Sequence, residues 1–173
     1  MLKVALSGST GLIGSRIIEL LKNEFTFVPL LQSEVDIADK DSKDKAIEAM
    51  DFDIFLHLAA YTNVDGAEKD RELAYIINVK GTGHVFDAVM NKKKQLIYIS
   101  TDFVFDGTNP PYFEDSKPSP LGYYAETKYQ GEQIVKDNAM IIRFSYPYRA
   151  RFEQKKDFVK NITTLLQERK QIN

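Results

Sequence analysis

Apolar residues recur along this chain in two alternating patterns. Short apolar runs between turn-forming residues predict buried strands, and apolar residues three or four positions apart predict helices. The first strand is expected at 4–6, and a helix follows with Ile13, Ile17, Leu20 and Leu21 on one face. Five more strands are expected, at 25–31, 35–37, 53–58, 95–100 and 140–144. Helices are expected around 46–50, over 73–89 with an interruption at Gly81 and Gly83, and over 124–135.

Strands that alternate with helices predict right-handed crossovers and a parallel sheet with helices on both faces. We therefore expect an α/β fold, a doubly wound, Rossmann-like parallel sheet of about six strands in the order 3-2-1-4-5-6. Residues 1–150 would form a dinucleotide-binding domain and residues 151–173 a C-terminal helix. That helix has apolar residues on one face, which this domain, a further domain or another subunit must cover. They are Phe158, Ile162, Leu165 and Leu166.

One segment interrupts this alternation. The stretch 107–122 holds four prolines, at positions 110, 111, 118 and 120, and is expected to be a loop. It links the end of the strand at 95–100 to the helix that carries Tyr124. Ligands bind at the carboxyl ends of parallel strands in open α/β sheets, which favours a substrate-side loop over a plain surface connection.

Composition narrows the function classes. The 173 residues include 43% apolar residues and carry a formal net charge of −2. The apolar share favours a globular chain. The net charge gives no electrostatic reason to expect a nucleic acid or a membrane surface as a partner. The chain has no cysteine, which excludes disulfides, thiolate metal ligands and thiol nucleophiles. No cluster of His, Asp or Glu has metal-ligand spacing, so no metal site is expected. The expected compartment is the cytoplasm.

A glycine-rich turn joins the first strand to the first helix. Gly8, Gly11 and Gly14 have the spacing G-x-x-G-x-x-G, looser than the G-x-G-x-x-G fingerprint. Glycine lets the backbone turn tightly and lets a pyrophosphate approach the main-chain amides at the helix N-terminus. The turn therefore predicts a dinucleotide cofactor, the alternative being a turn that is glycine-rich for structural reasons alone.

Tyr124 and Lys128 stand four residues apart on a predicted helix and so share one face. A tyrosine has a pKa near 10, which is too high for efficient acid or base catalysis at neutral pH. A neighbouring ammonium stabilises the phenolate and lowers that pKa. The pair indicates hydride-transfer chemistry with a nicotinamide cofactor. The alternative is a packed tyrosine and a solvated lysine on an ordinary helix.

Several segments together resemble a known family. The stretch 59–68 reads AAYTNVDGAE, 99–107 reads ISTDFVFDG and 111–114 reads PYFE. The matching block is completed by Pro120, Leu121, Tyr124, Thr127, Lys128, Gly131 and Glu132. From residue 4 to about residue 146, the chain resembles the extended short-chain dehydrogenase/reductase superfamily and, within it, the dTDP-4-dehydrorhamnose reductase family.

The resemblance implies roles for four residues. Tyr124 would protonate the carbonyl oxygen during reduction, and Lys128 would lower the pKa of Tyr124 and bind the nicotinamide ribose. Thr101 would help to hold the substrate oxygen. Asn78 matches a helix asparagine associated with a proton-relay water. Its alternative is a helix-interior residue bonded to the backbone.

The resemblance also implies ligand-binding positions. Ala59, Ala60 and Tyr61 would line the cofactor, and Thr62, Val64 and Phe103 would approach the sugar or serve as loop packing residues. The remaining cofactor positions are Gly8, Thr10, Gly11, Leu12, Ile13, Gly14, Asp36 and Ile37, the last two lying against the adenine, together with Lys128 itself.

The choice between NADP and NAD depends on the end of the second strand. An NAD site places a carboxylate there, and an NADP site places a cation. Glu34 lies late for the first role, and Arg16 is the nearest candidate cation. The cofactor is therefore NADP or NAD, with NADP favoured slightly.

The resemblance implies a reductase that delivers hydride to the keto group of a nucleotide-activated deoxysugar. Two alternatives are a sugar-nucleotide epimerase or dehydratase, and a non-catalytic regulatory or binding module of the same family. Family members are generally longer, and where they usually have a Tyr-Gly pair this chain has Tyr146 followed by Pro147. We therefore expect the substrate lobe to be largely missing. A homodimer is one arrangement that would cover the C-terminal helix.

Overall fold

The computed structural model describes residues 1–31, 40–149 and 157–169. Within them, five parallel strands form one sheet in the order β2-β1-β3-β4-β5. This confirms the α/β class and the order predicted for these five strands. The third predicted strand, at 35–37, lies outside the described residues. The strands are β1 (Lys3–Ser7), β2 (Thr26–Leu30), β3 (Ile54–His57), β4 (Gln95–Thr101) and β5 (Ala139–Phe144).

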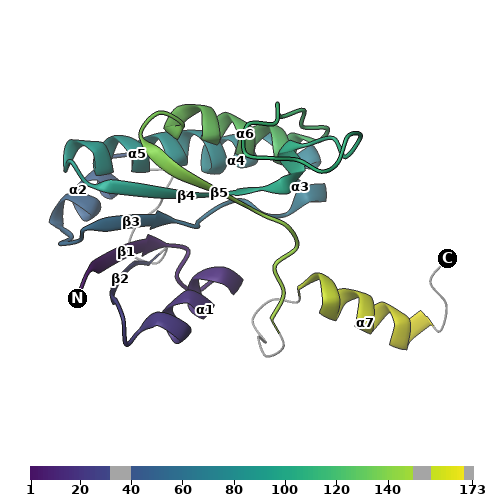
Figure 1. Cartoon of the computed structure of the whole chain (residues 1–173), viewed down its shortest axis with the longest axis horizontal. Helices are drawn as coiled ribbons and strands as arrows, with labels where there is room; N and C mark the ends of the chain where they lie inside the picture. The colour runs from purple at the N-terminus through teal and green to yellow at the C-terminus, as the bar shows by residue number, and fades with distance from the viewer. Residues whose placement is uncertain (32–39, 150–156, 170–173) are drawn as a thin grey trace.

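Helices lie on both faces of this sheet (Figure 1). One face is covered by a layer that includes α2, α4, α5 and α6, and α1 lies on the other face. The helices are α1 (Leu12–Leu21), α2 (Lys40–Ala49), α3 (Val64–Lys69), α4 (Arg71–Tyr75), α5 (Gly81–Asn91), α6 (Tyr123–Val135) and α7 (Phe158–Arg169). Two short helices of other types are η1 (Ile76–Lys80) and η2 (Asp102–Val104). No helix in the described part of the chain is both long and apolar enough to cross a membrane.

The two faces of the sheet have separate cores. Alternate side chains of a strand point to opposite faces, so β4 contributes Leu96 and Tyr98 to one core and Ile99 to the other. The first core includes Phe52, Phe55, Val85 and Val89 beneath the helical layer. The second is smaller and lies against α1. The sheet therefore lies between two apolar layers, which leaves its carboxyl edge for ligand binding.

The helical stretch predicted at 73–89 is continuous and is not broken by its glycines. The structure has α4, η1 and α5 in direct succession, and η1 is a π-helix. The irregularity therefore falls at 76–80 and not at Gly81 or Gly83. π-Helical turns of this kind occur frequently at functional sites.

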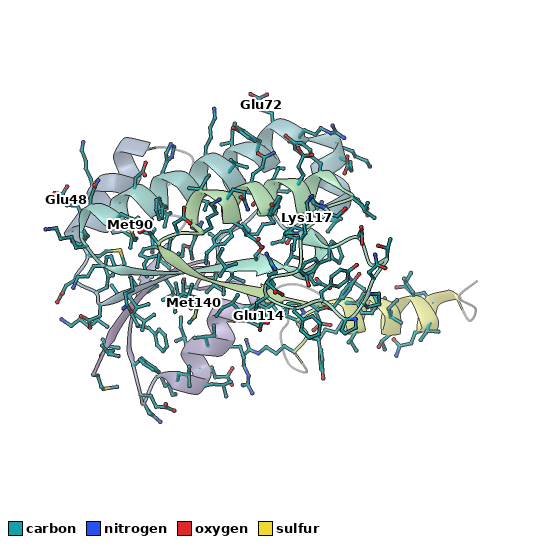
Figure 2. The ribbon with its side chains drawn as sticks, turned by 45° about the horizontal axis from the view of Figure 1, so that its top comes forward. Glu48, Glu72, Met90, Glu114, Lys117 and Met140 are labelled. Atoms are coloured by element: carbon teal, nitrogen blue, oxygen red, sulfur yellow. The ribbon has the colours of Figure 1, made fainter. Side chains whose placement is uncertain are left out.

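The proline-rich segment between η2 and α6 has neither helix nor strand, as predicted. Glu114 and Lys117 mark this loop in Figure 2, and Glu72 points away from the sheet on the outer side of the helical layer. The loop leaves the carboxyl end of β4 and returns to the start of α6. It therefore lies next to the edge where ligands are expected.

The apolar face predicted for the C-terminal helix is present on α7, but the described residues leave most of it uncovered. Phe158 is 51% exposed and Leu166 is 52% exposed. Within the described residues, Tyr146 contacts the Phe158 ring, with centroids 4.8 Å apart, and most of the apolar face stays exposed.

Gly131 allows α6 to pack closely on β4. A methyl group added there would lie 2.4 Å from the hydroxyl oxygen of Tyr98 and 3.0 Å from the backbone oxygen of Asn78. Tyr98 is fully buried and cannot move away easily. Gly83 on α5 differs, because the same methyl would meet only the side chain of Ile134, at 3.8 Å.

These two glycines make a matched pair of substitutions. Gly131→Ala should lower the free energy of unfolding by about 2 kcal/mol, because the helix or Tyr98 must shift to admit the methyl group. Gly83→Ala should raise it by about 0.5 kcal/mol through helix propensity. Urea unfolding followed by circular dichroism measures both changes. Equal effects at the two positions would contradict the close contact at Gly131.

Candidate functional site

The glycine turn packs closely against the residues that follow β3. Gly8 has a φ of +72°, which is favourable only for glycine, and a Cβ there would lie 2.9 Å from the backbone nitrogen of Ala59. A Cβ at Gly14 would lie 2.4 Å from the backbone oxygen of Gly8. Both positions therefore need glycine for a tight strand-to-helix turn.

The N-terminus of α1 is open toward this turn. Gly11 is its N-cap residue and, having no side chain, leaves the first-turn amides without a side-chain cap. Such amides and the helix dipole favour a phosphate group. The predicted cofactor positions that lie on the turn and the first turn of the helix are Gly8, Thr10, Gly11, Leu12, Ile13 and Gly14. Asp36 and Ile37, predicted to contact the adenine, lie outside the described residues.

Asn78 on η1 holds the segment that follows β3. Its Oδ1 accepts a hydrogen bond of 2.8 Å from the backbone N–H of Tyr61, and its Nδ2 donates to the Tyr61 carbonyl at 3.2 Å. The Nδ2 also donates to Thr127 Oγ1 on α6 at 3.0 Å. Asn78 is buried and bonded to backbone, as in the second of its two predicted roles. Its part in a proton relay stays a prediction.

A second hydrogen-bond network connects Asn78 to the carboxyl ends of β1 and β3. Thr82 Oγ1 donates to the Asn78 carbonyl at 2.7 Å, so it accepts from His57 Nε2 at 3.2 Å. Neutral His57 then accepts at Nδ1 from Ser7 Oγ, 2.7 Å away, and Ser7 Oγ accepts from the Ala59 N–H. The tautomer is assigned from this network. These bonds connect β1, β3 and η1, and so position residues 59–61.

Lys128 is buried at the end of β4. Lys128 is only 3% exposed. Its Nζ donates a 2.8 Å hydrogen bond to the Ile99 carbonyl. The ammonium also lies 4.1 Å from the centre of the Tyr98 ring. Burial lowers the pKa of Lys128 from 10.5 to about 7, and the Glu132 carboxylate acts in the opposite direction.

Tyr124 lies one helical turn before Lys128 and is half-buried. Burial raises its pKa above 10, an interaction with the Thr101 hydroxyl acts to lower it, and the Asp102 carboxylate raises it. In this geometry the Lys128 ammonium is directed to Ile99, so its predicted lowering of the Tyr124 pKa stays a prediction. The structure does bring Thr101, Tyr124 and Lys128 together at the end of β4.

A cavity of about 660 Å³ opens beside Tyr124. Val64 and Phe103, two of the three residues predicted to approach the sugar, line it, whereas Thr62 does not. The ring of Phe103 meets that of Tyr124 edge to face, with centroids 6.2 Å apart. The other lining residues are Asp102, Phe105, Asp106, Gly107, Tyr112, Leu121, Gly122, Ala125 and Arg143.

The sequence did not predict a role for two residues of this region. Glu132 on α6 is buried and forms a bidentate ion pair with Arg143 on β5. Glu132 stands four residues after Lys128, the same spacing that separates Tyr124 from Lys128. That spacing could have identified Glu132, but nothing in the sequence pairs it with Arg143.

The parallel sheet, the glycine turn before α1 and the Tyr124–Lys128 pair on α6 are together the features of the extended short-chain dehydrogenase/reductase fold. The family model described as "RmlD substrate binding domain" matches residues 2–173. The chain therefore belongs to the RmlD substrate binding domain family.

Relatives with known names agree with this assignment. A dTDP-4-dehydrorhamnose reductase of Aggregatibacter actinomycetemcomitans is 30% identical over 175 residues, which covers 98% of this chain and 58% of that protein. The methionine adenosyltransferase 2 subunit beta of Rattus norvegicus is 31% identical over 157 residues, covering 84% of this chain and 47% of that protein. The chain thus spans about half the length of these curated relatives.

A solved structure is similar over almost the whole chain. It is the dTDP-4-dehydrorhamnose reductase of Bacillus anthracis str. Ames in complex with NADP, with a TM-score of 0.88 and 36% sequence identity. The match covers 99% of this chain and 62% of that one.

The buried Lys128 should make stability depend on pH. Between pH 8 and pH 10 the unfolded chain still holds the proton that the folded chain has lost, so raising the pH favours the folded state. The free energy of unfolding should rise by up to about 1.4 kcal/mol per pH unit relative to the Lys128→Met variant. Urea unfolding at pH 7, 8, 9 and 10 measures this difference.

The control for this experiment is Lys136→Met, at an exposed lysine just after α6. Its stability should run parallel to that of the original chain over the same pH range. Parallel curves for Lys128→Met as well would contradict the depressed pKa of Lys128.

Proposed function

We propose that this chain carries the cofactor-binding and catalytic part of an NAD(P)-dependent reductase. The reaction is hydride transfer to the keto group of a nucleotide-activated deoxysugar, with NADP as the favoured cofactor. The observation that carries this proposal is the meeting of Thr101, Tyr124 and Lys128 at the end of β4, next to Phe103 on the wall of the cavity of about 660 Å³. The named relatives and the NADP complex of the Bacillus anthracis protein support it.

The residues of the carboxyl edge fit a dinucleotide. Gly8 and Gly14 leave no space for a Cβ, and the uncapped amides at the start of α1 suit a pyrophosphate. Ala59, Ala60 and Tyr61 would line the cofactor beside this turn, held by Asn78 and Ser7. Lys128 would bind the nicotinamide ribose. When bound, the reduced nicotinamide supplies the hydride.

Arg16 supports the preference for NADP. It lies on α1, is exposed, and pairs with Glu19 at 2.8 Å. The partner is exposed as well, so the guanidinium can turn to a 2′-phosphate at little cost.

The proton comes from Tyr124. Its hydroxyl donates a proton to the carbonyl oxygen as that carbon receives the hydride, which gives an alcohol and leaves a phenolate. Thr101 donates a hydrogen bond to the same oxygen and holds it in place. The charge on Lys128 stabilises the phenolate until solvent returns the proton.

The cavity is the proposed place for the sugar, with Val64 and Phe103 against its ring. We propose that residues 1–150 form the dinucleotide-binding domain and that 151–173 begin the substrate-binding portion. A following segment or a second copy in a homodimer would cover the exposed face of α7. The cytoplasm suits a chain without cysteine.

The cofactor preference can be measured directly. Titration of the purified chain with NADPH, followed by nicotinamide fluorescence, should give saturable binding that is tighter than binding of NADH, because Arg16 can meet the 2′-phosphate. Arg16→Ala should reduce the NADPH affinity about tenfold and leave the NADH affinity unchanged. A folded chain that binds neither nucleotide would sink the reductase proposal.

Catalysis tests the role of Tyr124. Tyr124→Phe should lower turnover of dTDP-4-dehydrorhamnose with NADPH by at least about a hundredfold, because the proton donor is lost, and NADPH binding should remain. NADPH consumption measured at 340 nm reports the rate. Tyr129→Phe, on the same helix, is the matched control and should keep full activity. Full activity of Tyr124→Phe would refute the assignment, and turnover without net NADPH consumption would favour an epimerase.

A further inference from the structure

A carboxylate lies buried on α6 without a role in the reaction described above. Glu132 is 1% exposed, and its two oxygens accept hydrogen bonds of 2.9 Å and 2.7 Å from Nε and Nη2 of Arg143. Burying an ion pair costs desolvation free energy that its Coulomb attraction does not always recover. A buried pair is therefore weak evidence for stability by itself, and its position in the site becomes informative.

The position of Glu132 repeats the spacing of the catalytic pair. Tyr124, Lys128 and Glu132 stand four residues apart in succession, so all three lie along one face of α6. Lys128 is the middle member, with the phenol one turn before it and the carboxylate one turn after it. Burial works against the charge on Lys128, and Glu132 is the charged group that opposes this effect.

Arg143 connects this face of α6 to the cavity. Its guanidinium lies 4.9 Å from the ring centre of Phe105, and Phe105 stacks on Tyr112 with centroids 4.3 Å apart. Arg143, Phe105 and Tyr112 all line the cavity. The guanidinium is thus held between the Glu132 carboxylate and an aromatic wall, which keeps the carboxylate in one orientation.

We propose that Glu132, clamped by Arg143, is a positioning residue that serves as the counter-ion of Lys128. It acts on the reaction through Lys128 and touches neither cofactor nor substrate. The proposal rests on the function proposed above for its consequence in catalysis. The ion relationship itself is a property of the folded chain and can be measured without any ligand.

Other groups around Lys128 do not take this role. On β4, Tyr98 presents its ring, and burial raises the pKa of its hydroxyl, so it stays neutral. Tyr124 on α6 is also neutral at pH 7, since burial raises its pKa. Asp102 on η2 acts on Tyr124 and bonds to Ser145. Arg143 on β5 is a cation and is paired with Glu132.

The test is a pH titration of the Lys128 side chain in the folded protein. Lysine labelled with ¹³C and ¹⁵N gives side-chain NMR signals whose shifts follow protonation, and a Lys128→Arg sample assigns the signal. In Glu132→Gln the midpoint should fall by about one pH unit, a tenfold loss of proton affinity, because the carboxylate that favours the charged form of Lys128 is gone. Glu126→Gln removes an exposed carboxylate from the same helix and should leave the midpoint unchanged.

A folding defect would not hide the result. Glu132→Gln leaves Arg143 without its partner, so the double variant Glu132→Gln/Arg143→Gln replaces the ion pair with two amides and restores neutrality. The midpoint should fall in the double variant too. An unchanged midpoint in either folded variant would overturn the proposal. Failure of both variants to fold would do so as well, because the pair would then be purely structural.

The titration also separates this proposal from the reductase function. A shifted midpoint in a chain that shows no turnover would support the counter-ion and leave the reductase proposal refuted. In an active chain, the alkaline limb of the kcat profile should move to lower pH in Glu132→Gln by the same amount as the midpoint. A loss of kcat at every pH, with an unmoved limb, would count against Glu132 acting through Lys128.

Discussion

The arrangement of this site depends on one buried ammonium. Lys128 lies where water cannot solvate its charge, and an uncompensated charge in such a place is costly. The protein meets it with the Ile99 carbonyl, the face of the Tyr98 ring and the carboxylate of Glu132. Because the first two belong to β4, the ammonium ties α6 to the end of that strand. Tyr124, one turn earlier, is thereby held beside Thr101.

The hydrogen bonds of Asn78 are a second constraint, on the side of the carboxyl edge formed by β1 and β3. Asn78 lies in a π-helical turn, where the backbone makes a wider turn than in an α-helix and re-aims its side chains. Its amide bonds to Tyr61 after β3 and to Thr127 on α6. It therefore fixes the distance between the strand end that faces the glycine turn and the helix that carries Tyr124.

Much of this could be predicted from the sequence, because the signals are local. The apolar runs of β1 and β3, the glycine turn and the Tyr124–Lys128 spacing each depend on residues near one another in the chain. The π-helical turn was not predicted, because no local pattern marks it and Asn78 within it bonds to Tyr61 and Thr127, which lie 17 and 49 positions away in the sequence. The pairing of Glu132 with Arg143 was missed for the same reason.

The remaining predictions concern residues outside the described ranges or contacts between elements. Strand 35–37, with Asp36 and Ile37, falls outside the described residues, so only five of about six strands can be compared. The cover of α7 could not be read from its pattern, because an apolar face states that a partner is needed and not which one. The same limit applies to Thr62, whose position in a matching segment did not place it on the cavity wall.

The two constraints together explain why the site lies at this edge of the sheet. β1 and β3 end at the glycine turn, and β4 and β5 end at the cavity wall formed with Arg143. Carboxyl ends of parallel strands meet along one edge, so a ligand that reaches both halves must pass the boundary between β3 and β4. α6 connects the two halves, because Thr127 is bonded to Asn78 and Lys128 is bonded to Ile99 on β4. A change at either bond would therefore alter the alignment of the two halves, even though each half kept its own fold.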